Sequence, residues 1–590
     1  MKTLLLLAAI FSLTTTKATA ALLSRELPNF IVILVDDLGR HDLGCYGSKF
    51  HQTPNLDRLA AQGMRFTQAY SACTVCSPTR AALLTGKYPA RLHVTDWIAG
   101  HKRPQAKLKV PDWTMHLPAS ERTIAASLKS AGYATVSIGK WHLGGPEFAP
   151  EKFGFDMNLG GASRGQPTSY FSPYKIATLP DGPEGEYLTD REAAEAVKFI
   201  ESNKDKPFFI YLPHHAVHTP LQAKKEVVEK YRARIKPGSG QTNAVYAALL
   251  ESVDDSVGRI VAKLEELKLA ERTVILFTGD NGGLIGPTSN TPLRAGKGSV
   301  YEGGVAVPLI VRWPGAIAAG SVNTTPVVSA DFAPTLLAMA GAKLVPGQIF
   351  DGVNLEPLLK GGTNVSRPLF WHYPHYHPGG ATPYGAVRDD DLRLIEFYET
   401  GRLELYDLKT DPRESKNLAM DQPDKAVALQ KKLDAWRRSV GAQMPMPNPS
   451  YRPNPQSADG SILLHSRAAD IYGAMLRYEP EPHKNTLGYW TKKEDWGSWD
   501  FTVEKPGAFT LEVLQGCGKG SGGAEVEFAI GEQKLTMTVQ DTGHFQNFIP
   551  RELGKVKVEK AGVYTLTVKP KTKPGVAVMD LRQVTLKPAK

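Results

Sequence analysis

The run Asn29–Asp37, apolar up to its two final carboxylates, constrains the fold of this chain more than any other feature. A continuous apolar run of this length predicts a strand buried on both faces, as in a parallel sheet covered by helices. Further strands are predicted at residues 64–70, 133–138, 207–212, 273–278 and 307–311, and helices at 121–130, 189–203 and 243–267. This order of elements predicts an α/β fold with a mostly parallel central sheet flanked by helices.

Polar residues follow four of the predicted strands. Open α/β sheets bind their ligands at the carboxyl ends of the strands, so we expect these side chains to converge. Two adjacent carboxylates repel each other, and a divalent cation would relieve that repulsion by accepting oxygen ligands. Taken alone, the carboxylate pair is also compatible with a surface turn. The residues are Asp36 and Asp37, Lys140 and His142, His218, and Asp280 and Asn281.

Cys76 opens the stretch CSPTRAALLTG at residues 76–86, which has helical composition after its proline. A residue near a helix N-terminus lies where backbone N–H groups and the helix dipole favour an anion. The alternative is a buried cysteine that packs as a small hydrophobe. Cys73 and Cys76 also have the spacing of a redox pair or half a zinc site, but the sequence has no second C-x-x-C, which argues against a zinc ribbon.

The Cys76 stretch and the segments around it resemble the signatures of the type I sulfatases. CSPTR at 76–80 resembles the first signature and GKWHLG at 139–144 the second. HTP at 218–220, GDNGG at 279–283 and GKGSVYEGG at 296–304 follow in the family order. Over roughly residues 28–440 the chain is therefore identified as a member of the type I (formylglycine-dependent) sulfatase family, arylsulfatase-like, in the alkaline-phosphatase-like superfamily.

The resemblance implies a sulfatase, a sulfuric ester hydrolase whose nucleophile is made after translation. In this family the cysteine at the position of Cys76 is oxidised to formylglycine (3-oxoalanine), an aldehyde that hydrates to a gem-diol. The resemblance also implies a bound Ca²⁺. A ligand set made only of oxygen atoms fits calcium better than zinc. The implied metal ligands are Asp36, Asp37, Asp280, Asn281 and the modified residue 76.

The resemblance also implies a role for each remaining site residue. One hydroxyl of the diol attacks sulfur, while His218 donates a proton to the leaving alcohol and Lys297 holds a sulfate oxygen. His142 then takes the proton of the second hydroxyl, which expels sulfate and restores the aldehyde. Arg80 and Lys140 steady the diol and its charge. A serine could not complete this cycle, because its sulfated form has no second hydroxyl.

A smaller subdomain is predicted at residues 366–443. Antiparallel strands are predicted at 367–377, 384–397 and 403–408, with a closing helix at 424–439. Polar groups of such a subdomain can lie at the mouth of the pocket and bind substrate, but the H-x-x-H-x-H spacing is also compatible with a transition-metal site or an ordinary loop. These groups are His372, His375, His377 and Arg388.

The chain changes character after a Pro-rich linker at residues 444–459. Residues 460–590 contain short alternating stretches separated by turn residues, which predicts a β-sandwich. This region loosely resembles galactose-binding-like carbohydrate modules. Its aromatic residues could stack on sugars or pack the core, and they include Tyr489, Trp490, Trp496 and Trp499.

The first twenty residues predict export. Lys2 precedes a short apolar run at residues 4–13, and Ala18-Thr19-Ala20 forms an A-x-A cleavage site. The apolar run is too short to span a membrane, so we expect a cleaved signal peptide at 1–20 and no membrane partner. The catalytic domain is then predicted at 25–365. A periplasmic or secreted bacterial enzyme is the preferred setting, with a lysosomal enzyme as the second choice.

The net charge of +10 bears on the partners of this protein. A basic surface attracts nucleic acid, anionic lipid or sulfated polysaccharide. The sequence has no long Lys/Arg run and no nucleic-acid-binding signature, so nucleic acid is not expected. Export and charge favour a sulfated polysaccharide or glycan as substrate. The family resemblance implies a formylglycine-generating or anaerobic sulfatase-maturing enzyme as a second partner. The alternatives are a phosphoesterase of the same superfamily and an inactive carbohydrate-binding homologue.

Overall fold

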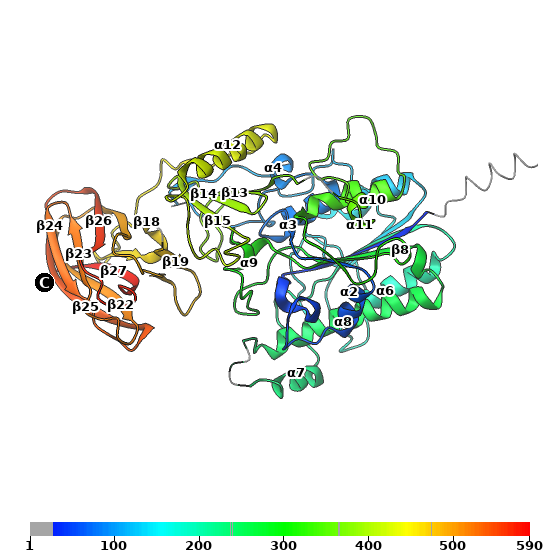
Figure 1. Cartoon of the computed structure of the whole chain (residues 1–590), viewed down its shortest axis with the longest axis horizontal. Coiled ribbons are helices and arrows are strands. Elements are labelled where there is room, and N and C mark those ends of the chain that lie inside the picture. The colour runs from blue at the N-terminus through cyan, green and yellow to red at the C-terminus, as the bar shows by residue number, and fades with distance from the viewer. Residues whose placement is uncertain are drawn as a thin grey trace, which may run out of the picture.

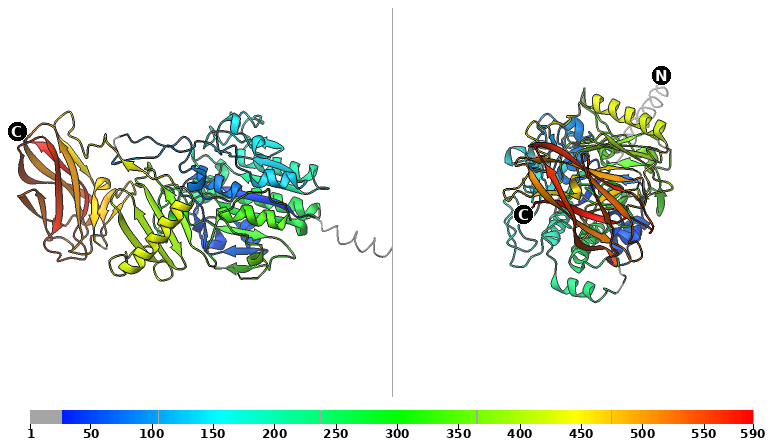
Figure 2. Two further views of the ribbon diagram at one scale, coloured as in Figure 1. Left: turned by 90° about the horizontal axis from the view of Figure 1, so that it is seen from above. Right: turned by 90° about the vertical axis from the view of Figure 1, so that its left-hand side faces the viewer.

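The computed structural model describes residues 27–589, except for 105, 237, 239, 364, 365 and 474. The predicted signal peptide lies outside the described residues. The described chain forms three parts in a row (Figure 1): a large sheet covered by helices, a small antiparallel sheet, and two further antiparallel sheets at the C-terminal end. Figure 2 shows the same order from above, with the small antiparallel sheet between the other two parts.

The strand β1 (Asn29–Val35) lies inside an eight-stranded sheet of order β10-β2-β9-β8-β1-β7-β5-β6. It pairs in parallel with β7 (Phe208–Pro213) and β8 (Thr273–Gly279), and β5 (Ala134–Ile138) pairs in parallel with β7. Only β9 (Leu309–Arg312) runs against its neighbours within this sheet as described. The predicted mostly parallel α/β sheet is therefore confirmed. The other strands are β2 (Met64–Phe66), β6 (Met157–Leu159) and β10 (Ser321–Asn323).

The stretch predicted as one strand at 64–70 forms two strands. β2 stays in the large sheet, whereas β3 (Ala69–Tyr70) pairs with β11 (Val327–Val328) in a separate two-stranded sheet. This second pairing brings the chain directly to the segment that precedes Cys76.

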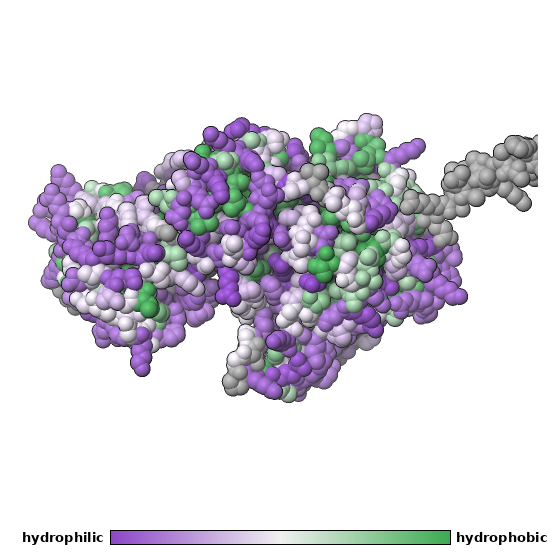
Figure 3. All heavy atoms as spheres, in the orientation of Figure 1, coloured by the Kyte–Doolittle hydropathy of each residue, from purple (hydrophilic) through white to green (hydrophobic). Residues whose placement is uncertain are grey.

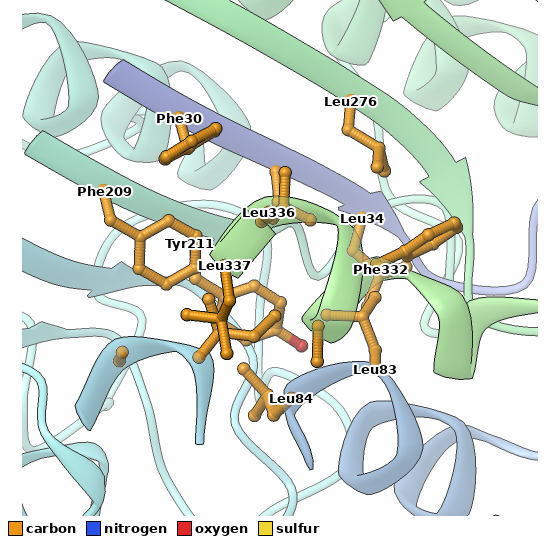
Figure 4. Close-up of a cluster of buried hydrophobic side chains, with 14 of the residues drawn as sticks. Phe30, Leu34, Leu83, Leu84, Phe209, Tyr211, Leu276, Phe332, Leu336 and Leu337 are labelled. Atoms are coloured by element: carbon orange, nitrogen blue, oxygen red, sulfur yellow. The ribbon is translucent and has the colours of Figure 1, made fainter. Parts of the chain in front are cut away.

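Alternate side chains of β1 enter two different hydrophobic cores, which explains its continuous apolar sequence. Phe30 and Leu34 face one core, together with residues of the helices α3 (Cys76–Thr85), α5 (Ile124–Ser130) and α10 (Phe332–Met339). Figure 4 shows Leu83 and Leu84 of α3 in this core, below Leu336 and Leu337 of α10. This packing fixes α3, and with it Cys76, against the central sheet.

The opposite core lies against three other helices. Ile31 and Ile33 of β1 pack there with α2 (Pro54–Ala61), α6 (Leu188–Ser202) and α8 (Ala244–Glu266). The sheet is thus covered on both faces, as the sequence predicts. Shorter described elements of this part are β4 (Leu108–Lys109), α4 (Pro89–Leu92), α7 (Lys225–Arg232), α9 (Glu302–Val305) and α11 (Glu356–Leu359).

The small sheet has the order β12-β13-β14-β15, and the helix α12 (Pro423–Ser439) packs on it. The region predicted as one strand at 384–397 is two strands, because the chain turns at Asp390, whose φ is 51°. Aspartate tolerates this left-handed conformation better than most residues. The strands are β12 (Leu369–Tyr373), β13 (Tyr384–Asp389), β14 (Leu392–Phe397) and β15 (Arg402–Asp407).

The C-terminal part is a sandwich of two antiparallel sheets around one core, as expected from its alternating stretches. Trp490 and Trp499 are fully buried in that core, whereas Tyr489 is 43% exposed. β16 (Met446–Pro447) of the linker pairs instead with β4. The sandwich strands are β17 (Ile462–His465), β18 (Asp470–Tyr472), β19 (Arg477–Glu479), β20 (Thr486–Gly488), β21 (Trp496–Val503), β22 (Gly507–Cys517), β23 (Glu525–Ile530), β24 (Gln533–Thr538), β25 (His544–Val558), β26 (Gly562–Pro570) and β27 (Asp580–Pro588).

The surface seen in Figure 3 is mostly hydrophilic, with small hydrophobic patches scattered over it. Within residues 27–589 as described, the structure has no helix with the length and apolar character needed to cross a membrane.

Candidate active site

Cys76 is the first residue of α3 and is 2% exposed. Its Sγ lies 3.4 Å from Oδ1 of Asp36 and 3.5 Å from Nζ of Lys297. Burial raises the pKa of the thiol to about 12, and the Asp36 carboxylate adds to this rise. An unmodified cysteine would therefore stay a neutral thiol at physiological pH, and a thiol is a poor nucleophile.

The carboxylates of Asp36 and Asp37 follow β1 directly and are both buried. Lys140 Nζ lies 2.5 Å from Asp36 Oδ2, and Lys297 Nζ lies 2.7 Å from Asp37 Oδ1. Burial alone would raise the pKa of Asp36, but Lys140 and the other nearby cations outweigh burial and hold it well below its ordinary value. Asp36 is thus an anion at neutral pH.

Arg80 connects the helix α3 to the end of β8. Its Nε and Nη2 donate to Oδ2 of Asp280 at 3.0 and 2.7 Å, and its Nη1 donates to the carbonyl of Lys140 at 2.9 Å. The side chains of Arg80 and Asp280 are fully buried. Removing one partner of such a pair would leave a buried charge without compensation, which typically costs about 3–5 kcal/mol.

His142 follows β5 and is 3% exposed. Its Nε2 donates to the carbonyl of Ile98 at 2.5 Å, because a carbonyl can only accept. Its Nδ1 is buried without a hydrogen-bond partner in the described structure. Burial, with Lys140, lowers the pKa of His142 well below its ordinary value, so the ring is neutral and Nδ1 is free to accept a proton.

His218 lies on the loop after β7, with Nε2 3.7 Å from Oδ2 of Asp37. Its Nδ1 lies 2.8 Å from the carbonyl oxygen of Thr219, which requires the proton on Nδ1 when the ring is neutral. The loop is tied to β1 by two backbone bonds, from Asp36 N to Ala216 O and from Val217 N to Asp36 O, each 3.0 Å long. These bonds set His218 beside the two carboxylates.

The donor set fits a hard cation. One ligand atom each from Asp36, Asp37, Cys76 and His218 lies within 4.8 Å of the others. Asn281 donates through Nδ2 to Asp37 Oδ1 at 2.8 Å, and its Oδ1 is buried with no hydrogen-bond partner among the described residues. A buried acceptor without a donor, next to two carboxylates, is the environment that an oxygen-binding cation would satisfy.

The structure thus brings the predicted core of the site together. Direct contacts join the predicted metal ligands and the catalytic candidates other than His142 at the carboxyl edge of the parallel strands. His142 follows β5 at the same edge, and its side chain bonds to the carbonyl of Ile98. Burial raises the pKa of Asp280 to about 6, and Asp36 adds to the rise, as expected where several carboxylates share one site. The residues are Asp36, Asp37, Cys76, Arg80, Lys140, His142, His218, Asp280, Asn281 and Lys297.

The predicted substrate residues have protein partners of their own. Both ring nitrogens of His372 are engaged, with Tyr398 Oη at 2.7 Å and the carbonyl of Gln443 at 2.9 Å. His375 Nε2 pairs with Thr95 Oγ1 at 2.8 Å, and the Arg388 guanidinium donates to the side chains of Tyr70 and Gln68. A substrate role for His372, His375 and Arg388 stays a prediction, and these contacts do not support it.

Two residues that the sequence did not single out hold the loop of His218. The hydroxyl of Tyr170 donates to the carbonyls of His215 and His218, at 2.6 and 2.9 Å. Glu192 of α6 accepts from His214 and His215, each at 2.6 Å. Glu192 and Tyr170 are fully buried. In the sequence Glu192 falls on the apolar face of its helix, four residues after Leu188 and four before Ala196, and this position is the one signal that points to it.

Tyr170→Phe tests this support. The change removes one hydroxyl and leaves two carbonyls of the His218 loop with one donor fewer. We expect kcat to fall about tenfold, since one hydrogen bond of this kind is worth about 1–1.5 kcal/mol, with KM little changed. Tyr174→Phe is the control, because the Tyr174 hydroxyl contacts Glu186 and not this loop. Equal kinetics for the two variants would contradict the role of Tyr170.

Asp96 gives the stability of the folded protein a pH dependence. Burial raises its pKa to about 7, although Tyr373 Oη and the Trp97 N–H donate to it. The folded protein then favours the protonated acid, so this stabilisation is full below about pH 4 and is lost as the pH rises towards 7. Between pH 5 and pH 8 we expect a loss of about 2 kcal/mol. Urea unfolding of Asp96→Asn should lack that loss, and an unchanged pH profile would contradict the assignment.

Comparison with known proteins identifies the family of the chain. The sulfatase family model matches residues 28–342, the model of the N-sulphoglucosamine sulphohydrolase C-terminal region matches 296–439, and a domain family of unknown function matches 478–590. A protein described as a sulfatase from Formosa agariphila is 34% identical over 495 residues, covering 70% of this chain and 89% of that protein. The N-acetylgalactosamine-6-sulfatase of Homo sapiens is 35% identical, covering 58% of this chain and 68% of the relative.

A solved structure gives the same result in three dimensions. The structure of Ps i-CgsB in complex with k-i-k-neocarrahexaose has a TM-score of 0.61 and 31% identity, covering 72% of this chain and 95% of that one. The matched family model spans more than half of this chain and includes Cys76, Arg80, His142 and His218. The chain therefore belongs to the sulfatase family, and it is a sulfuric ester hydrolase.

Proposed function

We propose that this protein removes sulfate from a sulfated polysaccharide or glycan outside the cytoplasm, using formylglycine at position 76 and Ca²⁺. The observation that carries the proposal is the setting of Cys76. It is the buried first residue of α3, in contact with Asp36 and Lys297, and burial holds its thiol neutral. A neutral thiol interacts only weakly with the charged groups around it. A hydrated aldehyde would offer oxygen atoms to the cations and an O–H proton to a nearby proton acceptor.

The side chains Asp36, Asp37, Asp280 and Asn281 would hold the calcium ion, together with residue 76. When bound, the ion would polarise a sulfate oxygen and favour ionisation of the diol. Lys140 and Lys297 pair with Asp36 and Asp37 and so reduce the repulsion between the two carboxylates.

The other residues divide the proton transfers between them. His142 presents a buried, unpartnered Nδ1 and would accept a proton from the diol. His218 lies next to Asp37 and, as an imidazolium, would protonate the leaving alcohol from Nε2, because Nδ1 keeps its proton on the Thr219 carbonyl. Lys297 would hold a sulfate oxygen as a cation, and Arg80 would hold Asp280 in place.

The substrate class rests on the relatives and on charge. Relatives are described as N-acetylgalactosamine-6-sulfatases, and the structural relative Ps i-CgsB binds a neocarrahexaose. The net charge of +10 suits a polyanionic substrate. Export follows from the signal-like residues 1–20, and a maturation enzyme in the producing cell would convert Cys76.

Parallel assays test the proposal. We expect the matured protein to hydrolyse 4-nitrophenyl sulfate or a sulfated oligosaccharide at least about 100-fold faster than 4-nitrophenyl phosphate, a difference of about 2.7 kcal/mol. EGTA should abolish turnover and added Ca²⁺ should restore it and raise the melting temperature. Faster phosphate release would indicate a phosphoesterase instead, and binding of glycans with no release of either anion would indicate an inactive carbohydrate-binding homologue.

A further inference from the structure

The carboxyl edge of the parallel sheet faces the two C-terminal parts of the molecule. The chain enters β1 at the end of the molecule opposite the sandwich (Figure 1). The strands β7 and β8 run parallel to β1, and β5 runs parallel to β7, so all four strands that precede site residues point in the same direction. The site therefore opens towards the small antiparallel sheet, and the sandwich lies beyond it (Figure 2). A long substrate that leaves the site in this direction would meet residues of the sandwich.

Lysine, histidine and arginine side chains lead outward from the site along this direction. The His377 ring packs on Gly298, next to Lys297, so closely that a Cβ on Gly298 would fall 2.2 Å from its Nδ1. His101 Nδ1 then donates to the carbonyl of Tyr376, the residue before His377, at 3.4 Å. Arg103 Nε donates to His101 Nε2, also at 3.4 Å. These contacts form a continuous series from Lys297 to Arg103.

The sandwich adds Arg467 to this series. Arg467 is exposed in the single helical turn Ser466–Ala468 after β17. Its backbone N–H donates to His465 Nδ1 at 3.2 Å, and His465 Nε2 lies 3.1 Å from Nδ2 of Asn485, whose Oδ1 accepts from the Tyr478 hydroxyl at 2.5 Å. In agreement with this placement, burial lowers the pKa of Arg103 and the positive charge of Arg467 adds to this lowering. Within the described part of the chain neither arginine forms an ion pair, and Glu399, whose charge acts on Arg103, accepts a hydrogen bond from Tyr376.

The loop that carries His377 also touches the sandwich. Gly380 packs against Tyr478 of β19, since a Cβ on Gly380 would fall 3.3 Å from the tyrosine ring. Lys107 of the catalytic part lies 3.7 Å from Asp470 of β18. The junction is therefore a defined contact between the two parts, and it brings the loop of His377 to the strand β19 of the sandwich.

We propose that Arg103 and Arg467 bind further sulfate groups of the polysaccharide whose ester lies at residue 76, on a track that continues outward from Lys297 past His377 and His101. The proposal rests on the proposed function and assigns the C-terminal sandwich to the substrate site. Two unpaired arginines favour sulfate because the planar guanidinium offers paired donors to an oxyanion. Like charges held together without a counter-charge are costly, and a bound polyanion would remove that cost.

Direct binding tests the track. Fluorescein-labelled dextran sulfate is titrated with the whole protein, and fluorescence anisotropy gives the Kd. Arg467→Glu should weaken binding about tenfold, the size expected for losing one charge contact and adding one repulsion. The control is Lys557→Glu on β25, whose side chain is 71% exposed and far along the sandwich in sequence, and it should change Kd less than about twofold. If both variants lost the same affinity for dextran sulfate, the effect would come from the change in net charge alone, and the proposal would be overturned.

Inhibition connects the track to the active site. Dextran sulfate should inhibit hydrolysis of 4-nitrophenyl sulfate competitively, and Arg467→Glu should raise the inhibition constant about tenfold without changing kcat/KM for this small substrate. Dextran without sulfate groups should not inhibit. An oligonucleotide of equal charge that inhibits equally well would overturn the assignment to a sulfated polysaccharide. If no sulfate ester is hydrolysed, the proposed function fails, whereas the binding titration still decides the track.

Discussion

Cys76→Ser is expected to abolish steady-state sulfate release, with kcat reduced by at least about 10⁴-fold. The serine hydroxyl occupies the same position at the start of α3 and can attack sulfur once. The resulting sulfate ester has no second hydroxyl to expel the anion, so the enzyme stops after one turnover. Intact-protein mass spectrometry should then show one sulfate per chain, and a stopped-flow trace should show at most one equivalent of leaving group.

The fold of this variant is expected to survive. Sulfur and oxygen differ little in size, and Cys76 contributes no disulfide, since all four cysteines are free. Cys73→Ser is the matched control, because Cys73 is almost equally buried three residues earlier and its sulfur contacts none of the site carboxylates among the described residues. This variant should keep its activity. Wild-type turnover by Cys76→Ser would rule out the second-hydroxyl mechanism.

His218→Ala has the second largest expected effect, and the effect should depend on the leaving group. A sugar alkoxide needs a proton as it departs, so we expect a loss of about 10²–10⁴-fold for a sulfated sugar. Nitrophenolate is a stable anion that needs no proton, so the loss for 4-nitrophenyl sulfate should be much smaller. The comparison has its own control, because damage to the fold would reduce both rates alike.

Rates with a series of substituted aryl sulfates measure this effect. In the wild-type protein the dependence of kcat/KM on leaving-group pKa should be shallow, and in His218→Ala it should be steep. The same slope in both proteins would contradict the assignment of His218 as the proton donor.

The central part of the fold could be predicted because strands that are buried on both faces have continuous apolar sequences. β1, β7 and β8 are buried on both faces, and their apolar runs end at Asp37, His218 and Asp280 within a few residues. Parallel strands then place those ends at one edge, so the core of the site could be predicted before any contact was known.

Other features depend on partners that lie far away in sequence. Tyr170 comes from an irregular segment, and its role exists only because the carbonyls of His215 and His218 lie opposite its hydroxyl. His372 was predicted at the pocket mouth, yet Tyr398 and Gln443 use both of its nitrogens. No periodicity specifies which side chains meet in such places.

The buried charges explain why this arrangement needs many coordinated residues. Asp36 keeps its charge only because Lys140 and the neighbouring cations outweigh burial. Arg80 in turn depends on Asp280. Each charge is tolerable because a partner is fixed beside it, so single substitutions in this network are expected to cost stability as well as activity.

Mass spectrometry of the tryptic peptide that contains residue 76 tests the central claim most directly. The protein is produced with and without a formylglycine-generating enzyme, and sulfatase activity is measured on the same preparations. The account predicts that active protein carries the aldehyde at residue 76, with the lower mass of formylglycine, and that activity rises in proportion to the converted fraction. Full activity in a preparation whose residue 76 is entirely unmodified cysteine would contradict it.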